Sequence, residues 1–249
     1  MRLNAYIAKA GYCSRRNATV FIKEGKVKVG GKVLLEPWYV VMPGDAVSVC
    51  GKLLRAETGI YIIVNKPKGV TATVEDPHAL RKITEIVPKR SARLYPVGRL
   101  DKDSRGLIIL TNDGDLCYRL THPKFEIEKE YVVTVKGLLD IDILERLKKG
   151  VFSEGDILKV KSYFGVKSAG SHTTLHVVIA EGKKRHLRRL FKALDKPVTD
   201  LKRIRIGDLR LGEMKEGTFE KIDRETIYSL ALKDISKNPG KTGRTKPSI

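Results

Sequence analysis

One polar stretch of the sequence combines a carboxylate with several cations and leads directly into an apolar run. It occupies residues 95–111 and ends in Leu-Ile-Ile-Leu-Thr. Arg99, Lys102 and Arg105 surround Asp101, and this nearby positive charge should favour the ionised carboxylate. Catalytic groups often lie on a loop that a buried strand holds in place. The stretch could therefore present a carboxylate nucleophile or base, although an exposed, charge-balanced turn would have the same composition.

The composition of the whole chain limits its class and its partners. The 249 residues include 41% hydrophobic residues and carry a formal net charge of +20. This length allows one large domain plus a small one, and the hydrophobic fraction is typical of a folded globular protein and not of a disordered one. So large a positive charge indicates a polyanionic partner, with nucleic acid a better candidate than a membrane.

The cysteines and the apolar runs indicate a reducing, aqueous environment. Cys13, Cys50 and Cys117 are far apart and have neither zinc-site nor redox-motif spacing. The histidines do not pair with them as metal ligands would, so no metal site is predicted. The first residues lack the continuous apolar core of a signal peptide, and no run is long enough to span a membrane. We therefore expect a cytoplasmic protein with reduced thiols and no membrane partner.

The first 52 residues have the pattern of a small basic domain. Leu3, Ile7 and Ala10 share one helical face, and Ser14 is a suitable N-cap for a second helix over residues 15–24. Alternating residues on both sides of a two-glycine turn then predict a hairpin. Five exposed cations of this segment could follow a phosphate backbone, or could simply form a solvated face. These candidate RNA-binding residues are Arg15, Arg16, Lys23, Lys26 and Lys28.

A larger domain follows a polar, glycine-bounded segment. We predict a linker at residues 53–59, a catalytic domain at 60–236, and a basic, disordered tail at 237–249 that is rich in Lys, Gly and Pro. Within the larger domain, strand-like runs alternate with helical stretches. One such run, residues 173–179, precedes a helix whose apolar stripe lies beside several arginines.

Two sets of motifs resemble known families. Residues 3–11, 14–16 and 22–32, followed by a Pro-Gly-Asp turn, closely resemble the RNA-binding module named after ribosomal protein S4. The rest resembles the ribosomal RNA pseudouridine synthases that carry such a module at the N-terminus. The motifs of this second resemblance occur in one order, at residues 65–69, 97–101, 106–107, 110–114, 128–131 and 181–189.

The resemblance implies a fold and a role for each site residue. The fold would be α+β, with a mixed, mainly antiparallel sheet flanked by helices and an active cleft across the middle of the sheet. Asp101 would be the catalytic nucleophile, and Arg99 would help to expose the target base. Tyr131 would stack on that base and assist proton removal. Arg188 would form a salt bridge with Asp101, and Leu201 would pack beneath the base.

The reaction implied by the resemblance suits these residue types. Isomerisation breaks the bond between uracil and ribose, turns the base and rejoins it through carbon, so neither a redox cofactor nor a methyl donor is needed. A carboxylate can be the nucleophile, as in glycosidases, and would attack either the ribose or the base ring. A stacked base must be flipped out to react, and stacking on an aromatic side chain offsets part of that cost by about 1–3 kcal/mol.

We therefore expect an enzyme that acts on ribosomal RNA or on a ribosomal subunit assembly intermediate, as a monomer. Large-subunit rRNA is the favoured target and small-subunit rRNA the alternative. A non-catalytic ribosome assembly factor would need only the basic domain and not the combination of Asp101, Tyr131 and Arg188. An RNA methyltransferase would need a glycine-rich nucleotide loop after a strand, and the sequence has none.

Overall fold

The computed structural model describes residues 1–55, 57–73, 80–88 and 93–232, so the predicted tail at 237–249 lies outside the described residues. Two compact units are present. The first comprises Met1–Ile60, Lys89–Leu94 and Thr111–Gly114, and the second comprises the remaining segments.

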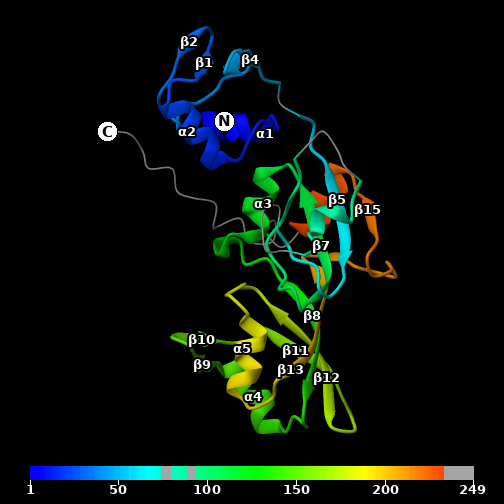
Figure 1. The fold of residues 1–249 in the computed structure, drawn as a ribbon. Coiled ribbons are helices and arrows are strands. Elements are labelled where there is room, and N and C mark those ends of the chain that lie inside the picture. The colour runs from blue at the N-terminus through cyan, green and yellow to red at the C-terminus, as the bar shows by residue number, and fades with distance from the viewer. Residues whose placement is uncertain (56, 74–79, 89–92, 233–249) are drawn as a thin grey trace. The chain divides into compact units, whose positions relative to one another are not determined.

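The first unit contains two short helices and a small antiparallel sheet (Figure 1). Ser14 accepts a hydrogen bond from the backbone N–H of Asn17 at 3.2 Å, which caps the second helix as predicted. Leu3, Ile7 and Ile22 are fully buried between the helices and the sheet. The predicted helices and hairpin are therefore confirmed. The elements are α1 (Leu3–Lys9), α2 (Arg15–Lys23), β1 (Val27–Val29), β2 (Lys32–Val33), β3 (Val47–Val49) and β4 (Lys52–Leu53), in sheet order β2-β1-β3-β4.

The second unit is built on a nine-stranded sheet among the described residues, with main order β11-β12-β8-β13-β7-β5-β15. β13 runs parallel to β7, whereas its pairing with β8 and that of β8 with β12 are antiparallel. The predicted mixed, mainly antiparallel sheet is thus confirmed. The strands are β5 (Tyr61–Lys66), β6 (Tyr95–Pro96), β7 (Arg105–Thr111), β8 (Lys129–Lys136), β11 (Ser162–Ala169), β12 (His172–Ile179), β13 (Val198–Ile206), β14 (Leu209–Arg210) and β15 (Phe219–Lys221).

Helices and a separate hairpin accompany this sheet (Figure 1). β7 is buried along its apolar residues without alternation, as expected of a strand covered on both faces. The predicted apolar stripe of α5 (His186–Ala193) consists of Leu187, Leu190 and Phe191. This helix packs against β13 and against the hairpin formed by β9 and β10. These elements are η1 (Ile83–Glu85), α3 (Gly114–Thr121), η2 (Pro123–Phe125), α4 (Ile141–Lys149), β9 (Val151–Ser153), β10 (Asp156–Leu158), α5 (His186–Ala193) and α6 (Arg224–Ala231).

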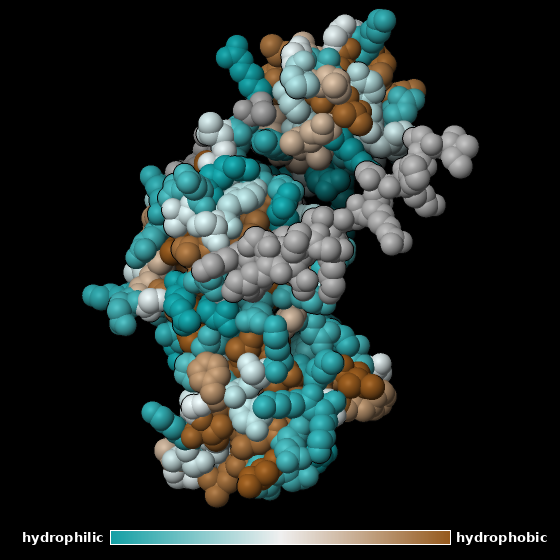
Figure 2. Space-filling view, turned by 180° about the vertical axis from the view of Figure 1, so that it is seen from behind, coloured by the Kyte–Doolittle hydropathy of each residue, from teal (hydrophilic) through white to brown (hydrophobic). Residues whose placement is uncertain are grey.

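Hydrophilic residues cover most of the face of the molecule drawn in Figure 2, with hydrophobic residues visible between them. All five candidate RNA-binding cations of the first unit are exposed, although Lys26 is paired with Glu24 at 2.8 Å. No helix of the described residues is both long and apolar enough to cross a bilayer.

Candidate active site

A cavity of about 300 Å³ in the second unit brings together residues that are far apart in the sequence. Arg99 and Asp101 contribute to its wall from the loop between β6 and β7, and Tyr131 and Leu201 from the adjacent central strands β8 and β13. The cavity therefore gathers four of the five predicted catalytic-domain site residues, and only Arg188 is not part of its lining.

The loop that carries Asp101 is anchored on both sides of the carboxylate. Val97 donates its backbone N–H to Ile109 O at 2.8 Å, and Ser104 N–H donates to Asp101 O at 3.0 Å. Leu100 is buried next to Asp101, while the Asp101 side chain remains 34% exposed. The backbone thus holds the loop on both sides of the carboxylate, which lines the cavity.

The ion pair of Asp101 differs from the predicted one. Asp101 pairs with Arg185 at 3.7 Å, whereas Arg188 Nε lies 3.2 Å from Asp103 and Arg188 Nη2 donates to Ser104 Oγ at 3.2 Å. The predicted Asp101–Arg188 pair is therefore wrong. Arg185 precedes α5 in a left-handed conformation (φ 50°) that lets its side chain reach the cavity, whereas Arg188 lies within the helix and is 11% exposed.

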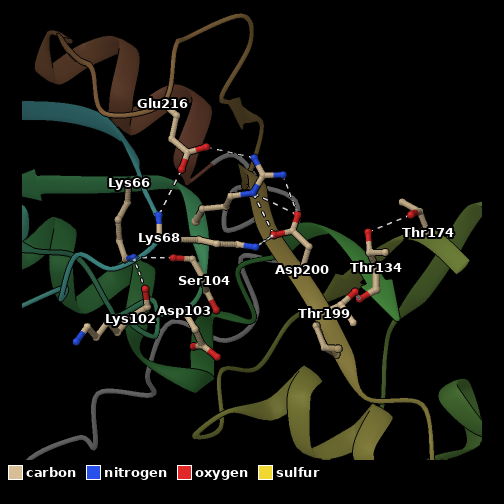
Figure 3. A network of polar contacts seen from close by, with 12 residues as sticks. Lys66, Lys68, Lys102, Asp103, Ser104, Thr134, Thr174, Thr199, Asp200 and Glu216 are labelled. Atoms are coloured by element: carbon tan, nitrogen blue, oxygen red, sulfur yellow. Dashed lines mark hydrogen bonds and ion pairs between the residues drawn. The ribbon is translucent and has the colours of Figure 1, made fainter. Parts of the chain in front are cut away.

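Arg105 was expected to lie beside Asp101, but it pairs with other carboxylates. Its guanidinium faces Asp200 on β13, with Nη2 donating to Oδ2 at 2.8 Å, and also contacts Glu216 at 3.4 Å. Lys68 Nζ lies 2.6 Å from the other oxygen of Asp200 (Figure 3). Partial burial alone would raise the pKa of Asp200, but the hydrogen bonds from Arg105 and Lys68 outweigh it and lower that pKa to about 2.

This cluster predicts a pH-dependent contribution to stability. We expect Asp200→Asn to lower the free energy of unfolding by about 2 kcal/mol at pH 7, because the folded-state pKa lies below the unfolded value near 4. The carboxylate stabilises the fold above its unfolded pKa and loses that effect as pH falls through its folded pKa. The difference between wild type and Asp200→Asn should therefore close between about pH 4 and pH 2, in urea unfolding.

The matched control is Asp142→Asn, an exposed carboxylate whose contact with Arg146 is 4.0 Å. Its effect should stay within about 0.5 kcal/mol at every pH. A loss for Asp200→Asn no larger than that for Asp142→Asn would contradict the role of the Asp200 cluster.

Lys66 donates hydrogen bonds to the backbone of the loop that carries Asp101. It is fully buried, and its Nζ donates to the carbonyl oxygens of Ser104 at 2.6 Å, Pro67 at 2.9 Å and Lys102 at 3.4 Å (Figure 3). Desolvation lowers the pKa of Lys66 to about 8. The end of β5 and the Asp101 loop are thus joined by a buried amine.

Lys129 also lines the cavity and was not identified from the sequence. It lies two residues before Tyr131 on β8, and both residues line the cavity. Lys129 stands between two glutamates, so it had the appearance of a solvated charge. Strand alternation was the signal that could have found it, because residues two apart face the same side of a sheet.

Comparisons with known proteins identify the family of this chain. Residues 1–47 match the model of the S4 domain, and residues 60–193, more than half of the chain, match a family described as RNA pseudouridylate synthase. This chain belongs to the RNA pseudouridylate synthase family. The predicted family, enzyme class and α+β architecture are thereby confirmed.

Full-length relatives support the assignment. The enzyme is 38% identical over 235 residues to an uncharacterized RNA pseudouridine synthase of Aquifex aeolicus, covering 92% of this chain and 96% of the relative. It is 37% identical over 240 residues to ribosomal large subunit pseudouridine synthase B of Bacillus subtilis, covering 95% and 98%. A crystal structure of a pseudouridylate synthase aligns with a TM-score of 0.64 and 28% identity, over 92% of this chain and 99% of that one.

Proposed function

We propose that this enzyme converts a specific uridine of ribosomal RNA, in the large subunit by preference, to pseudouridine. The observation that carries the proposal is the position of Asp101 on the wall of a cavity that it shares with Tyr131 and Leu201. The name of the Bacillus subtilis relative supports the choice of large-subunit rRNA. Small-subunit rRNA is the second candidate.

In this proposal the target uridine leaves its helix and enters the cavity. Arg99, which is exposed at the cavity, would help to expose the base. Tyr131 would stack on the uracil and assist removal of its C5 proton, while Leu201 would pack beneath the ring. The Asp101 carboxylate would attack either the ribose or the base ring.

The resemblance implied that Arg188 alone holds Asp101, and in this proposal two arginines share that role. Arg185 would hold the Asp101 carboxylate through the 3.7 Å ion pair. Arg188 would fix the loop one step further on, through Asp103 and Ser104. Arginine suits both positions because its planar guanidinium can contact several acceptors at once.

The first unit would supply RNA affinity through its basic face, in a cytoplasmic, monomeric enzyme. We keep residues 1–52 as the RNA-binding domain and residues 60–236 as the catalytic domain. Phosphate contacts position a protein on RNA without reading its sequence.

If residues 1–52 bind RNA through phosphate contacts, removing cations from this domain should weaken RNA binding in a salt-dependent way. We expect the double variant Arg15→Glu, Arg16→Glu to weaken RNA binding and to reduce the slope of log affinity against log salt by about 2, because each lost phosphate contact removes about one unit. The rate at saturating RNA should stay near that of wild type. Filter binding at several salt concentrations measures the slope, and a slope equal to that of wild type would contradict phosphate binding by Arg15 and Arg16.

The proposed function is tested by mapping pseudouridines in the rRNA of a deletion strain. One large-subunit position should lose its pseudouridine and regain it when wild-type enzyme is restored. Loss at a small-subunit position would favour the second candidate, and rRNA that retains every pseudouridine would refute both.

A further inference from the structure

The cavity lining includes a partly buried cation, Lys129, to which the proposed mechanism has assigned no role. We call the lining residues of β8, β12 and β13 the floor of the cavity; they are Lys129, Tyr131, Ile179, Leu201, Arg203 and Ile206. Lys129 lies at the start of β8 and lines the cavity. In the sheet it stands opposite Ile179 of β12 and Ile206 of β13, and both of these residues also line the cavity. Lys129 therefore has an apolar residue beside it on each neighbouring strand.

The next row of the same floor contains Tyr131, the residue proposed to stack on the uracil. Its cross-strand partners are Val177 and Arg203. Residues two apart on a strand are separated by about 6.8 Å. A base stacked on Tyr131 would thus place its polar edge within reach of a long side chain that starts from Lys129.

No carboxylate of residues 1–55, 57–73, 80–88 or 93–232 neutralises the positive charge of Lys129. Its Nζ donates one hydrogen bond, to Ile127 O at 2.7 Å, and forms no ion pair with a carboxylate of the described residues. The neighbouring Arg203 donates from Nε to Leu107 O at 2.7 Å, and its Nη2 lacks a hydrogen-bond partner among those residues. Desolvation, with a smaller contribution from Arg203, lowers the pKa of Lys129 to about 8.

Cations that are removed from water and lack a paired carboxylate suit a site in which negative charge appears during the reaction. The pseudouridine reaction generates such charge by either route open to Asp101. If the carboxylate bonds to the ribose C1′, the C1′–N1 bond breaks and its electron pair is left on the base, delocalised to O2 and O4. If the carboxylate bonds to C6 of the ring, the C5–C6 π pair moves through the C4 carbonyl to O4.

We propose that the Lys129 ammonium donates a hydrogen bond to a carbonyl oxygen of the flipped uracil and stabilises the anionic base. This inference rests on the proposed function and adds a catalytic residue to it. No proton passes from Lys129. In the C6 route the C1′–N1 bond breaks next and leaves its electron pair on N1. In both routes the later steps form the C5–C1′ bond, release the Asp101 carboxylate, transfer the C5 proton to a base and return a proton to N1. Electrostatic stabilisation of this kind is strongest where water is excluded, and Ile179 and Ile206 flank Lys129 in the sheet.

The decisive variant is Lys129→Met, which keeps the length of the side chain and removes its charge and its donor. We expect the single-turnover rate on a large-subunit rRNA transcript to fall about 100-fold, as when one donor to a developing anion is removed. The affinity for the transcript should stay within about threefold, because this interaction forms mainly in the transition state. Lys129→Gln, which restores a neutral donor, should lie between Lys129→Met and wild type.

Lys136→Met is the matched control, since Lys136 ends the same strand and is exposed. Its rate should stay near that of wild type. Circular dichroism and transcript affinity confirm that each variant is folded. A wild-type rate in Lys129→Met, or an equal loss of rate in Lys136→Met, would overturn the proposal.

The pH profile separates charge stabilisation from packing. The ammonium is the active form, so the wild-type rate should fall as pH rises through about 8. Lys129→Arg should keep its activity beyond that pH, because arginine stays protonated. Lys66 also has a pKa near 8. A decline that remains in Lys129→Arg would assign the titration to another group, such as Lys66, and overturn the role of Lys129.

Other charged and titratable groups around the cavity differ from Lys129 in position or type. They are Arg203 on β13, Tyr131 on β8, His122 after α3, Arg99 and Asp101 on the Asp101 loop, Glu181 with residues 183–185 before α5, and His186 at the start of α5. All of them remain in Lys129→Arg. A shift of the basic limb in that variant therefore reports on Lys129 itself.

A substrate change provides an independent test. Stem-loop RNAs carry the target uridine with either O4 or O2 replaced by sulfur, a poorer hydrogen-bond acceptor. One replacement should slow wild type more than it slows Lys129→Met, and it identifies the oxygen. If both replacements slow the two enzymes equally, the proposed contact does not exist. A wild-type enzyme that modifies neither these RNAs nor the transcript would instead refute the proposed function.

Discussion

Asp101→Asn is expected to abolish pseudouridine formation while RNA affinity stays within about threefold of wild type. Loss of a covalent nucleophile lowers the rate by about 10⁴-fold or more in well-studied enzymes. An amide has the size of the carboxylate but cannot serve as the nucleophile, so the loop and the cavity should keep their form. Release of the C5 hydrogen from labelled rRNA measures the rate, and filter binding measures the affinity.

Asp103 is a second carboxylate of the same loop and provides the control for Asp101→Asn. It accepts ion pairs from both Arg185, at 3.5 Å, and Arg188, at 3.2 Å, so it is more closely paired than Asp101. It is half exposed and is not part of the cavity lining. Asp103→Asn should therefore retain activity within about tenfold of wild type, as expected of a residue that only positions others. Full activity in Asp101→Asn, or complete loss only in Asp103→Asn, would move the nucleophile to the other carboxylate.

The features predicted from the sequence are those that short-range patterns determine. Helix α2 begins after its Ser14 cap, and α5 buries the apolar stripe that its spacing indicated. The family resemblance implied that Asp101, Tyr131 and Leu201 share one site, and the cavity brings these three together. Each of these predictions depends on local periodicity or on motif order, which the sequence contains in full.

The features that the sequence did not predict depend on which distant charges meet. The pairing of Asp101 with Arg185 depends on a left-handed, non-glycine residue before α5, for which no sequence rule exists. Asp200 is 95 residues away from its partner Arg105. In a chain with 49 lysines and arginines, neither burial nor partner can be assigned to a charge from spacing alone.

Gly106→Ala is expected to have the largest effect on stability, because this glycine lies where two strands approach each other closely. Gly106 faces Arg203 in the parallel pairing of β7 with β13. A Cβ atom at this position would lie 2.2 Å from Arg203 O and 2.7 Å from Arg203 N. Both are backbone atoms, so the strand itself would have to move. We expect a loss of about 4 kcal/mol or more in the free energy of unfolding, measured by urea unfolding, as for other severe steric conflicts.

Gly155→Ala separates this steric effect from the cost of the backbone conformation. Gly155 also has a positive φ, of 83°, but a Cβ there would have no neighbour within 4 Å. It should lose only about 1–2 kcal/mol, the usual penalty for a side chain in that conformation. Equal losses in the two variants would show that the approach of β13 is not decisive. We also expect Gly106→Ala to lose activity, even in molecules that fold. Gly106 lies near the start of β7, after the Asp101 loop, whereas β13 carries Leu201 and Arg203. The glycine would thus determine the distance between the nucleophile and the floor on which the base is proposed to rest.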